Sequence, residues 1–406
     1  MTEADLPPTF SLPEPASDVP SSGPADGPPP GSGPQARRKW PTVVVAIVFV
    51  LAVLVIVSSR ITLNEYALTP GDAQPVDPLV TVPPAKVHRV HGQILLTDVF
   101  VAQLTLLEYL PYRWNPDAQL VPGAELLDPD TPAGQLTDQG YLEMAQSQSF
   151  AKAAAFRRLG YGVPEQNAGT VMYAVKPGSP GSSTLDVGDI VTAVGATPTP
   201  DTCAFIGALS TSVPGQKVQL TVTPVTFNNN GVPVRAKTVH KTVRLGKPPA
   251  GGAASGCPGL HGPSPVYLGV EIETQQDFTY PFPTSIDTAQ IGGPSAGLAM
   301  TLGLLDKLTS GSLTGGEKIA ATGTIDAAGN VGDVGGVAQK TVAVENAGAR
   351  VFFVPPEELA AAKSKGNASL HIYAVSTLDQ ALTILGRLGG HVPPKPPAAA
   401  APPKAP

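Results

Sequence analysis

The sequence predicts an α+β protein whose parts follow one another along the chain. Three observations predict this class: a charge-free apolar run at residues 42–57, short β-branched runs between residues 170 and 245, and alternating strand and helix patterns over residues 266–388. The alternation is typical of a compact α/β or α+β domain. With 406 residues, the chain is long enough for two or three domains and a sizeable core.

Composition excludes several classes of partner. The net charge is −6 and only 14% of residues are charged, so we expect no nucleic-acid partner. Much of the proline and glycine lies at the two ends, which predicts a disordered tail over residues 1–39 and a Pro/Ala-rich tail over residues 389–406. No histidine or cysteine lies at chelating spacing from Cys203 or Cys257, so these do not resemble metal ligands, and we expect no metal and no cofactor.

Residues 40–60 predict a transmembrane helix. The run at residues 42–57 carries no charge and is close to the ~17–25 residues that a helix needs to cross a bilayer. Residues 37–39 are Arg-Arg-Lys and only Arg60 follows closely, so the N-terminus is expected in the cytoplasm and the rest outside. A cleaved signal peptide is the alternative. It would have an unusually long preceding segment and no Ala-x-Ala site, so we favour an uncleaved anchor.

An outward location gives the two cysteines a meaning. In an oxidising compartment, Cys203 and Cys257 either pair, which would tie a domain to the linker that leaves it, or remain separate thiols. Their spacing in the sequence does not decide between these alternatives, because it says nothing of the distance between their Cα atoms.

Residues 61–160 are predicted to form a stalk followed by a membrane-proximal strand and helix. Residues 61–87 are rich in proline and indicate an extended stalk. Residues 92–107 have a strand pattern, and residues 143–159 have helical periodicity that ends at Gly160.

The next segment, residues 161–247, has a turn and a strand of a recognisable kind. The turn is Lys-Pro-Gly-Ser-Pro at residues 176–180, and Leu-Asp-Val-Gly-Asp-Ile-Val follows at residues 185–191. These residues resemble a PDZ domain of the bacterial protease-associated type. The resemblance implies a small β-barrel, here with strands at 170–175, 217–225 and 238–245 and a helix near 201–210.

The PDZ resemblance also implies a binding loop. In PDZ domains, a glycine-bearing loop offers backbone N–H groups to a peptide's C-terminal carboxylate, and the peptide adds as a strand. Tyr161, Gly162 and Val163 lie where that loop would fall. The alternative is that Gly162 only turns the chain after the preceding helix, and both interpretations stay open here.

A linker over residues 248–265 leads to a domain over residues 266–388. Its pattern predicts strands at 266–274, 318–325 and 350–354, and helices at 295–308 and 337–347, before a last helix and strand that reach about residue 387. Each of the two helices begins after a short glycine-rich turn.

Two residues after these turns carry the chemistry. Ser295 lies at a helix start, where it is either a cap or a nucleophile whose oxyanion the nearby backbone N–H groups can hold. Lys340 lies on an apolar helix face with Val337, Thr341 and Val344. It is either a lysine that extends its amine to water or a buried amine with a lowered pKa, able to act as a base.

Gly-Pro-Ser-Ala-Gly around Ser295, followed by Gly-Gly-Val-Ala-Gln before Lys340, resembles the proteolytic domain of the Lon family. The resemblance implies a Ser–Lys dyad with Ser295 as nucleophile and Lys340 as general base. Thr322, in a Thr-Gly turn, matches the family's threonine that orients the lysine, and the N–H of Ala296 would help to hold the oxyanion. Gly292 departs from the family, which usually has an acidic residue three positions before the serine.

No Gly-x-x-x-x-Gly-Lys-Ser/Thr loop occurs in the sequence, so we expect an ATP-independent enzyme. The whole pattern resembles membrane-anchored PDZ–Lon proteins of Gram-positive, actinobacterial type. It implies a serine endopeptidase that cuts unfolded or exposed polypeptide presented by the PDZ domain; homo-oligomer formation stays open. The alternative is a peptide-binding PDZ protein with an inactive Lon-like domain.

A further hypothesis concerns the order of the parts. The strand at residues 92–107 and the helix at residues 143–159 resemble the start of the Lon proteolytic domain. The PDZ-like segment would then be inserted into the protease domain and would not precede it.

Overall fold

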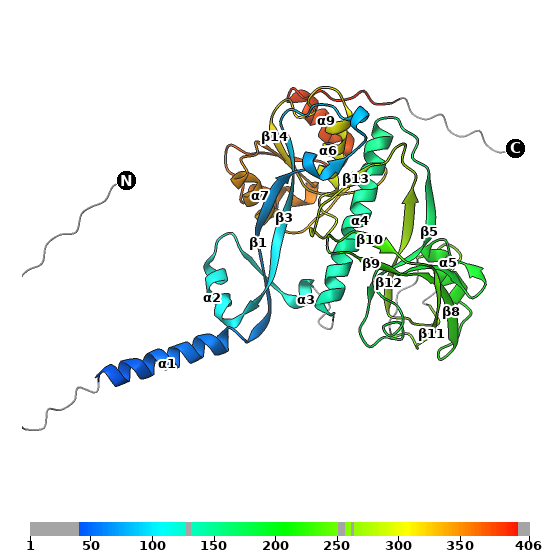
Figure 1. Ribbon diagram of the computed structural model, residues 1–406, viewed down its shortest axis with the longest axis horizontal. Helices are drawn as coiled ribbons and strands as arrows, with labels where there is room; N and C mark the ends of the chain where they lie inside the picture. The colour runs from blue at the N-terminus through cyan, green and yellow to red at the C-terminus, as the bar shows by residue number, and fades with distance from the viewer. Residues whose placement is uncertain (1–39, 127–130, 251–255, 261–263, 397–406) are drawn as a thin grey trace, which may run out of the picture. The chain divides into compact units, whose positions relative to one another are not determined.

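A computed structural model describes residues 40–126, 131–250, 256–260 and 264–396 (Figure 1). The tail predicted over residues 1–39 lies outside the described residues, as do residues 397–406 of the predicted C-terminal tail. The chain divides into two compact units, Met1–Leu54 and Val55–Pro406.

The apolar run forms helix α1 (Trp40–Ser58), whose large apolar side chains, such as Val45 and Phe49, are exposed. Among the helices of the described residues, none is both long enough and apolar enough to cross a membrane. The transmembrane helix predicted over residues 40–60 therefore gains no support from the structure.

The first sheet of the second unit has six strands in the order β18-β17-β14-β3-β1-β4 (Figure 1). The stalk predicted over residues 61–87 is wrong, because half of it is a long strand that pairs antiparallel with β3 from Thr62 to Pro75. Its prolines are accommodated by a register shift after Pro70 and by its end at Pro75. The strands are β1 (Thr62–Pro75), β3 (Gln93–Thr105), β4 (Gln119–Pro122), β14 (Lys318–Ala321), β17 (Val351–Val354) and β18 (His371–Ala374).

The strand β3 joins distant parts of the chain in this sheet. It pairs in parallel with β14, from Gln93 opposite Lys318 to Leu95 opposite Ala320. The strand predicted over residues 92–107 thus lies in the same sheet as the segment that leads to Thr322. The second sheet, described below, is formed by residues that lie between β3 and β14 in the sequence.

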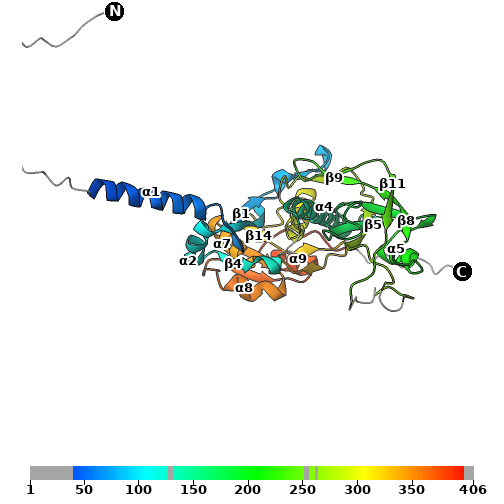
Figure 2. The same cartoon turned by 90° about the horizontal axis from the view of Figure 1, so that it is seen from below.

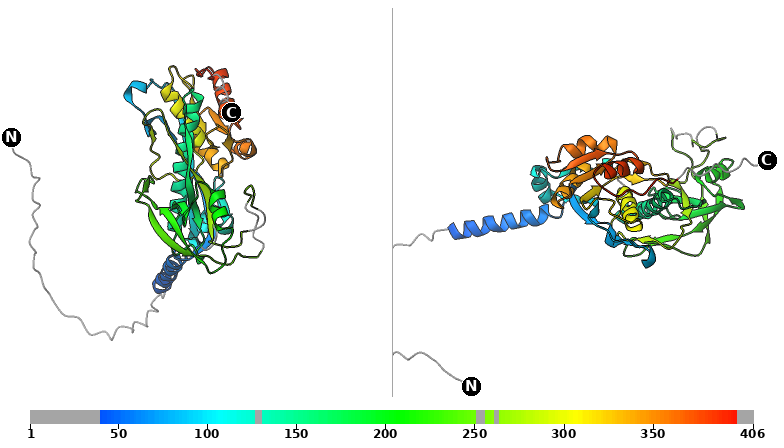
Figure 3. Two further views of the ribbon diagram at one scale, coloured as in Figure 1. Left: turned by 90° about the vertical axis from the view of Figure 1, so that its right-hand side faces the viewer. Right: turned by 90° about the horizontal axis from the view of Figure 1, so that it is seen from above.

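Helices cover both faces of the first sheet. Ile94 and Leu96 of β3 face a core shared with α4, α6 and α9, whereas Leu95 faces α7 and α8. This alternation buries both faces, as expected of parallel strands between helical layers. Figures 2 and 3 show α4 and α8 on opposite sides of this layer. The helices are α4 (Ala133–Arg158), α6 (Gly297–Leu308), α7 (Val337–Asn346), α8 (Leu359–Lys363) and α9 (Leu378–Arg387).

The second sheet has the strand order β11-β8-β6-β5-β12, with β7 paired to β6, and has its own apolar core. The strand predicted over residues 266–274 as the start of the protease domain is β12, and it pairs with β5 of this sheet. It is an edge strand, because β5 is its only neighbour among the described strands. The elements are β5 (Glu165–Val175), β6 (Ile190–Val194), β7 (Thr197–Pro198), α5 (Thr202–Leu209), β8 (Lys217–Thr223), β11 (Val239–Arg244) and β12 (Val270–Phe278).

The remaining elements are short and connect or flank the two sheets. The hairpin β15–β16 follows the Thr322-Gly323 turn. These elements are α2 (Leu106–Trp114), α3 (Gly123–Leu126), β2 (Val80–Thr81), β9 (Val225–Phe227), β10 (Pro233–Arg235), β13 (Ser285–Ile286), β15 (Thr324–Ile325), β16 (Val331–Gly332) and three 3-10 turns, Asp77–Leu79, Pro84–Lys86 and Pro356–Glu358.

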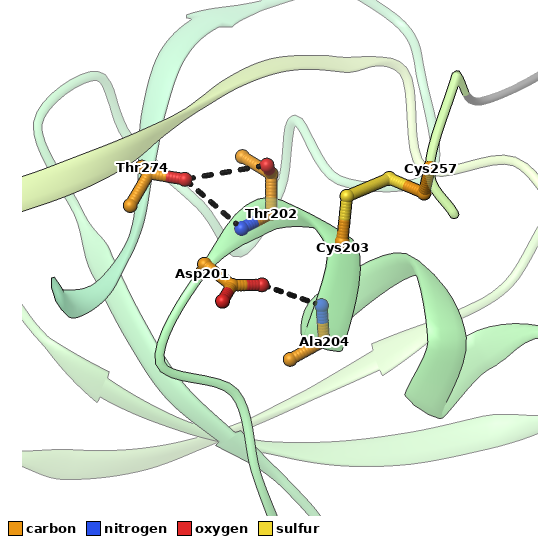
Figure 4. The surroundings of a disulfide bond; sticks show 6 residues. All are labelled: Asp201, Thr202, Cys203, Ala204, Cys257 and Thr274. Atoms are coloured by element: carbon orange, nitrogen blue, oxygen red, sulfur yellow. Dashed lines mark hydrogen bonds between the residues drawn. A yellow bond between two sulfur atoms is a disulfide. The ribbon is translucent and has the colours of Figure 1, made fainter. Parts of the chain in front are cut away.

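Cys203 and Cys257 form a disulfide, with their Cα atoms 5.4 Å apart (Figure 4). Cys203 lies in the first turn of α5, whose N-cap Asp201 accepts a hydrogen bond from the Ala204 N–H at 2.8 Å. The bond attaches the segment that follows β11 to the helix beside the edge strand β12.

Candidate active site

Ser295 lies in a turn two residues before α6 begins at Gly297, and is half-buried. The next residue, Ala296, is only 2% exposed, so the turn packs closely against the residues around it. Among the hydrogen bonds of the described residues, none is donated by the backbone N–H of Ser295 or of Ala296. The turn therefore presents two adjacent donors of the kind that hold an oxyanion.

The Thr322-Gly323 turn fixes the backbone of Ser295. The Thr322 hydroxyl donates to the Ser295 carbonyl oxygen at 3.2 Å, and the Gly323 N–H donates to the same oxygen at 2.9 Å. Gly323 has a φ of 142°, and a Cβ there would lie 2.6 Å from Val331. Only glycine fits this position without movement of the neighbouring hairpin.

Lys340 reaches the same turn from the other side of the first sheet. It lies in α7, is 2% exposed, and donates from Nζ to the Thr322 hydroxyl oxygen at 3.2 Å. The helix begins at Gly336, whose φ of 69° lets the chain turn beside Val99 of β3. Lys340 is thus a buried amine and does not extend to water.

Burial lowers the pKa of Lys340 to about 8 from 10.5, while the carboxylates of Asp98 and Glu358 oppose this shift. A buried ammonium loses hydration that one hydroxyl partner does not replace, so the neutral amine gains relative stability. The pKa of Asp98 is itself raised by burial, although the Asp72 N–H donates to its carboxylate at 2.7 Å.

The structure thus brings together Lys340, Thr322 and the backbone of Ser295. In the described part of the chain, the Ser295 hydroxyl and the Lys340 amine are not hydrogen-bonded to each other; Thr322 contacts the Lys340 amine and the backbone carbonyl oxygen of Ser295. Three of the predicted residues, Ser295, Thr322 and Lys340, therefore lie close together at the N-terminal end of α6, with Ala296 next to the serine.

Gly292, where the family's acid is missing, lies against α4. A Cβ on Gly292 would lie 3.2 Å from the carbonyl carbon of Gly140. The next residue, Gly293, donates from its N–H to the Gly140 oxygen at 2.8 Å. The two backbones pack closely here, and a side chain at this position would require a shift of a few tenths of an ångström between the loop and α4.

The predicted peptide-binding loop does not lie at a free sheet edge. Residues 161–163 lead into β5, which pairs with β12 along its length and with β6 at Thr170 and Val171. Val163 is buried in an aromatic cluster with Phe156, and Tyr161 packs edge-on against Phe156 at 5.7 Å. The packing of this loop gives no support to its peptide-binding interpretation, and Gly162 follows the turn that ends α4.

A different glycine turn leads to the free edge. Tyr267, Leu268 and Gly269 precede the edge strand β12, and Gly269 has a φ of 73°. Among the described hydrogen bonds, none is donated by the N–H of Leu268 or Gly269. Sequence reasoning missed this loop because the strand after it was assigned to the protease domain. The sequence signal that could have indicated this loop is Tyr-Leu-Gly-Val at residues 267–270, which comes directly before the alternating run of β12.

Within the described residues, no group of three or more His, Cys, Asp or Glu side chains could hold a metal ion.

Residues 287–385, which include Ser295, Thr322 and Lys340, match the family described as the Lon protease (S16) C-terminal proteolytic domain. The match confirms the predicted resemblance and supports a serine peptidase. Two Lon proteases are similar in sequence. That of Chloroflexus aggregans is 33% identical over 94 residues, 22% of this chain and 11% of that protein. That of Koribacter versatilis is 34% identical over 99 residues, 23% of this chain and 12% of that protein.

The chain thus spans about a tenth of the length of these curated relatives. Among solved structures, it is similar to the PDZ domain of the SdrC-like protein from Listeria monocytogenes. The identity is 14% and the TM-score 0.20, over 26% of this chain and 87% of that chain. A TM-score this low does not establish a shared fold.

The buried amine predicts a pH-dependent cost of folding. As pH falls from about 10.5, an unfolded chain protonates Lys340 before the folded chain does, so the folded state loses stability until about pH 8. Lys340→Met removes this cost and should raise the free energy of unfolding at pH 7 by up to about 3 kcal/mol. The gain should shrink to near zero by about pH 10.5 in denaturant titrations.

The matched control is Lys363→Met, at an exposed lysine of α8, which should show no such gain. If Lys340→Met is no more stable than the wild type at pH 7, or if its gain does not shrink with rising pH, the lysine is not a destabilised buried amine.

Proposed function

We propose that this chain is an ATP-independent serine endopeptidase in which Ser295 is the nucleophile and Lys340 the general base. The observation that carries the proposal is the buried Lys340 amine on the Thr322 hydroxyl, whose turn also fixes the Ser295 backbone. ATP independence rests on the sequence, which contains no phosphate-binding loop of the Gly-x-x-x-x-Gly-Lys-Ser/Thr kind.

The residues divide the chemistry as follows. With a pKa of about 8, roughly a tenth of Lys340 is neutral at pH 7 and can accept the Ser295 proton as its oxygen attacks a peptide carbonyl. The N–H groups of Ser295 and Ala296 hold the oxyanion, each worth roughly a few kcal/mol in the transition state. Lys340 then protonates the leaving amine, and water releases the acyl group. Thr322 orients the lysine.

Hydrolysis of unfolded casein by the purified full chain tests this proposal. Wild type should cleave casein without ATP, and Ser295→Ala and Lys340→Ala should each lower turnover at least roughly 1,000-fold. Ser364→Ala, at an exposed serine after α8, is the matched control and should retain wild-type turnover. Equal turnover by wild type and Ser295→Ala would contradict the assignment. No turnover by any variant would favour the alternative, a peptide-binding protein with an inactive domain.

We also propose that the second sheet captures polypeptide C-termini at its edge strand β12. Support comes from the free edge of β12 and from the unengaged N–H groups of Leu268 and Gly269 before it. A labelled peptide with a free C-terminal carboxylate should bind at least tenfold more tightly than its C-terminal amide.

Gly162→Ala is the control, since the space around Gly162 is open and its loop lies elsewhere; it should retain binding. Gly269→Ala should lower binding, because its Cβ would lie 2.1 Å from Ser179 Cβ. Equal affinity for carboxylate and amide, measured by fluorescence anisotropy, would overturn the proposed mode of capture.

We propose an extracytoplasmic location for the catalytic residues, with residues 40–60 as an uncleaved anchor and the N-terminus in the cytoplasm. The charge-free run at residues 42–57 and the basic residues 37–39 support the anchor. The Cys203–Cys257 disulfide fits an oxidising compartment. In isolated cells, the chain should stay in membranes after alkaline carbonate extraction and be accessible to added protease from outside. Its release by carbonate would contradict the anchor.

A further inference from the structure

One face of α4 holds the loop that precedes Ser295. Gly140 accepts a hydrogen bond from the Gly293 N–H at 2.8 Å, and the Ser147 hydroxyl donates to the Pro294 carbonyl oxygen at 2.9 Å. Positions 140, 143 and 147 are spaced three and four residues apart, so they share one side of the helix. The loop therefore takes its position from α4 over two helical turns.

Glu143 lies between these two contacts on the same side of α4. Its Oε1 accepts hydrogen bonds from the Tyr173 hydroxyl and, at 3.5 Å, from Gln139 Nε2. Its Oε2 faces the loop, since a Cβ on Gly293 would lie 3.9 Å from it. Glu143, Tyr173 and Pro294 all line one cavity of about 390 Å³ beside the loop. The carboxylate is thus held from one side and adjoins the loop on the other.

Tyr173 belongs to β5 of the second sheet, at a point where the pairing of β5 with β12 is irregular. Glu271 of β12 is opposite Ala174 of β5, but Ile272 is opposite Met172, so Tyr173 is an extra residue on β5. A bulge of this kind redirects a side chain and is often found next to active sites. Here the bulge lies at the tyrosine whose hydroxyl bonds Glu143 of α4.

The bond between Tyr173 and Glu143 is polar and half-buried. Burial raises the pKa of both groups, and the nearby Glu273 carboxylate of β12 raises them further. Tyr173 therefore keeps its proton and remains a donor at neutral pH. A hydrogen bond to a carboxyl group costs more to lose at a site of this kind than at an exposed one.

We propose that Glu143 and Tyr173 are positioning residues that hold the loop before Ser295 in place, with Tyr173 attaching that loop, through α4, to the strand beside the edge strand β12. The inference rests on the proposed function, because it assigns these residues to the same serine. Neither residue contacts the reacting atoms. Their contribution is geometric, and a displacement of about 1 Å at a nucleophile can lower turnover about 100-fold.

Three variants of the full chain test the pair on casein hydrolysis. Tyr173→Phe removes only the donor and should lower kcat about tenfold with KM unchanged, because substrate-binding surfaces are untouched. Glu143→Ala should lower kcat at least as much. Glu143→Gln keeps an acceptor oxygen for Tyr173 and should restore most of the activity lost in Glu143→Ala. The double variant Tyr173→Phe/Glu143→Ala should be no worse than Glu143→Ala alone, because both changes break one interaction.

Tyr280→Phe is the matched control. Tyr280 is also a half-buried tyrosine whose hydroxyl bonds α4, donating to the carbonyl oxygen of Ser149, two residues beyond Ser147, at 3.0 Å. It should lose comparable stability but retain kcat. If Tyr173→Phe lowers kcat no more than Tyr280→Phe, or if Glu143→Gln is as impaired as Glu143→Ala, the positioning role is overturned.

A measurement that needs no activity separates this inference from the peptidase proposal. Amide hydrogen exchange over residues 291–296 should be at least several-fold faster in Tyr173→Phe than in wild type, whereas Tyr280→Phe should leave it unchanged. If exchange rises and no Ser295-dependent hydrolysis is found, the proposed function fails and the positioning contact stands. If exchange is unchanged, the positioning role fails whatever the activity.

Discussion

The burial of one amine is the constraint on which the rest of the site depends. Lys340 is 2% exposed and its pKa is about 8, and its amine bonds the hydroxyl of Thr322. A buried lysine costs stability, so the fold must supply that free energy elsewhere. It does so with a sheet whose central strands are covered on both faces, where Leu95 and Phe352 are almost fully buried. The lowered pKa of the amine is thus a consequence of the same layers that hold α7 in place.

The same layers explain why residues near the beginning of the sequence belong to this site. The strand β14 ends at Ala321, just before Thr322, and is held in parallel between β17 and β3. Without β3, one edge of β14 would be unpaired and the Thr322-Gly323 turn would lose a support. Asp98, one of the carboxylates near Lys340, also comes from β3. The residues of the second sheet lie between β3 and β14 in the sequence, although these two strands are neighbours in space.

The sequence predicts the helices that follow the glycine turns better than it predicts which strands pair. Helices at Ser295 and Lys340 have clear periodicity and glycine turns, and both lie within two residues of the prediction. The stalk prediction is wrong because proline content alone does not show where in a strand the prolines fall. Pro70 and Pro75 lie where the pairing of β1 with β3 shifts or ends, so a strand tolerates them. The strand β12 was placed in the wrong sheet because an alternating run specifies its buried face but not its neighbour. The Tyr-Gly-Val string at Tyr161 is ambiguous for the same reason, because a free edge is a property of the whole sheet and not of a local string of residues.

Two sets of contacts hold Ser295 and the loop before it, and they differ in how deeply they are buried. From the first sheet, Thr322 and Gly323 hold its carbonyl oxygen through a turn fixed by backbone pairing on both sides. From α4, Gly140 and Ser147 hold the loop before it through one hydrogen bond each, and Glu143 joins that helix face to Tyr173 of the second sheet. The first set belongs to a rigid element buried in the core, whereas the second depends on a few polar contacts beside a cavity. Polar contacts of this kind respond to changes at a neighbouring strand far more readily than a packed core does. On the proposed positioning role, the position of the serine is therefore more sensitive to the second sheet than to the first, even though Lys340, the proposed base, lies in α7 against the first sheet.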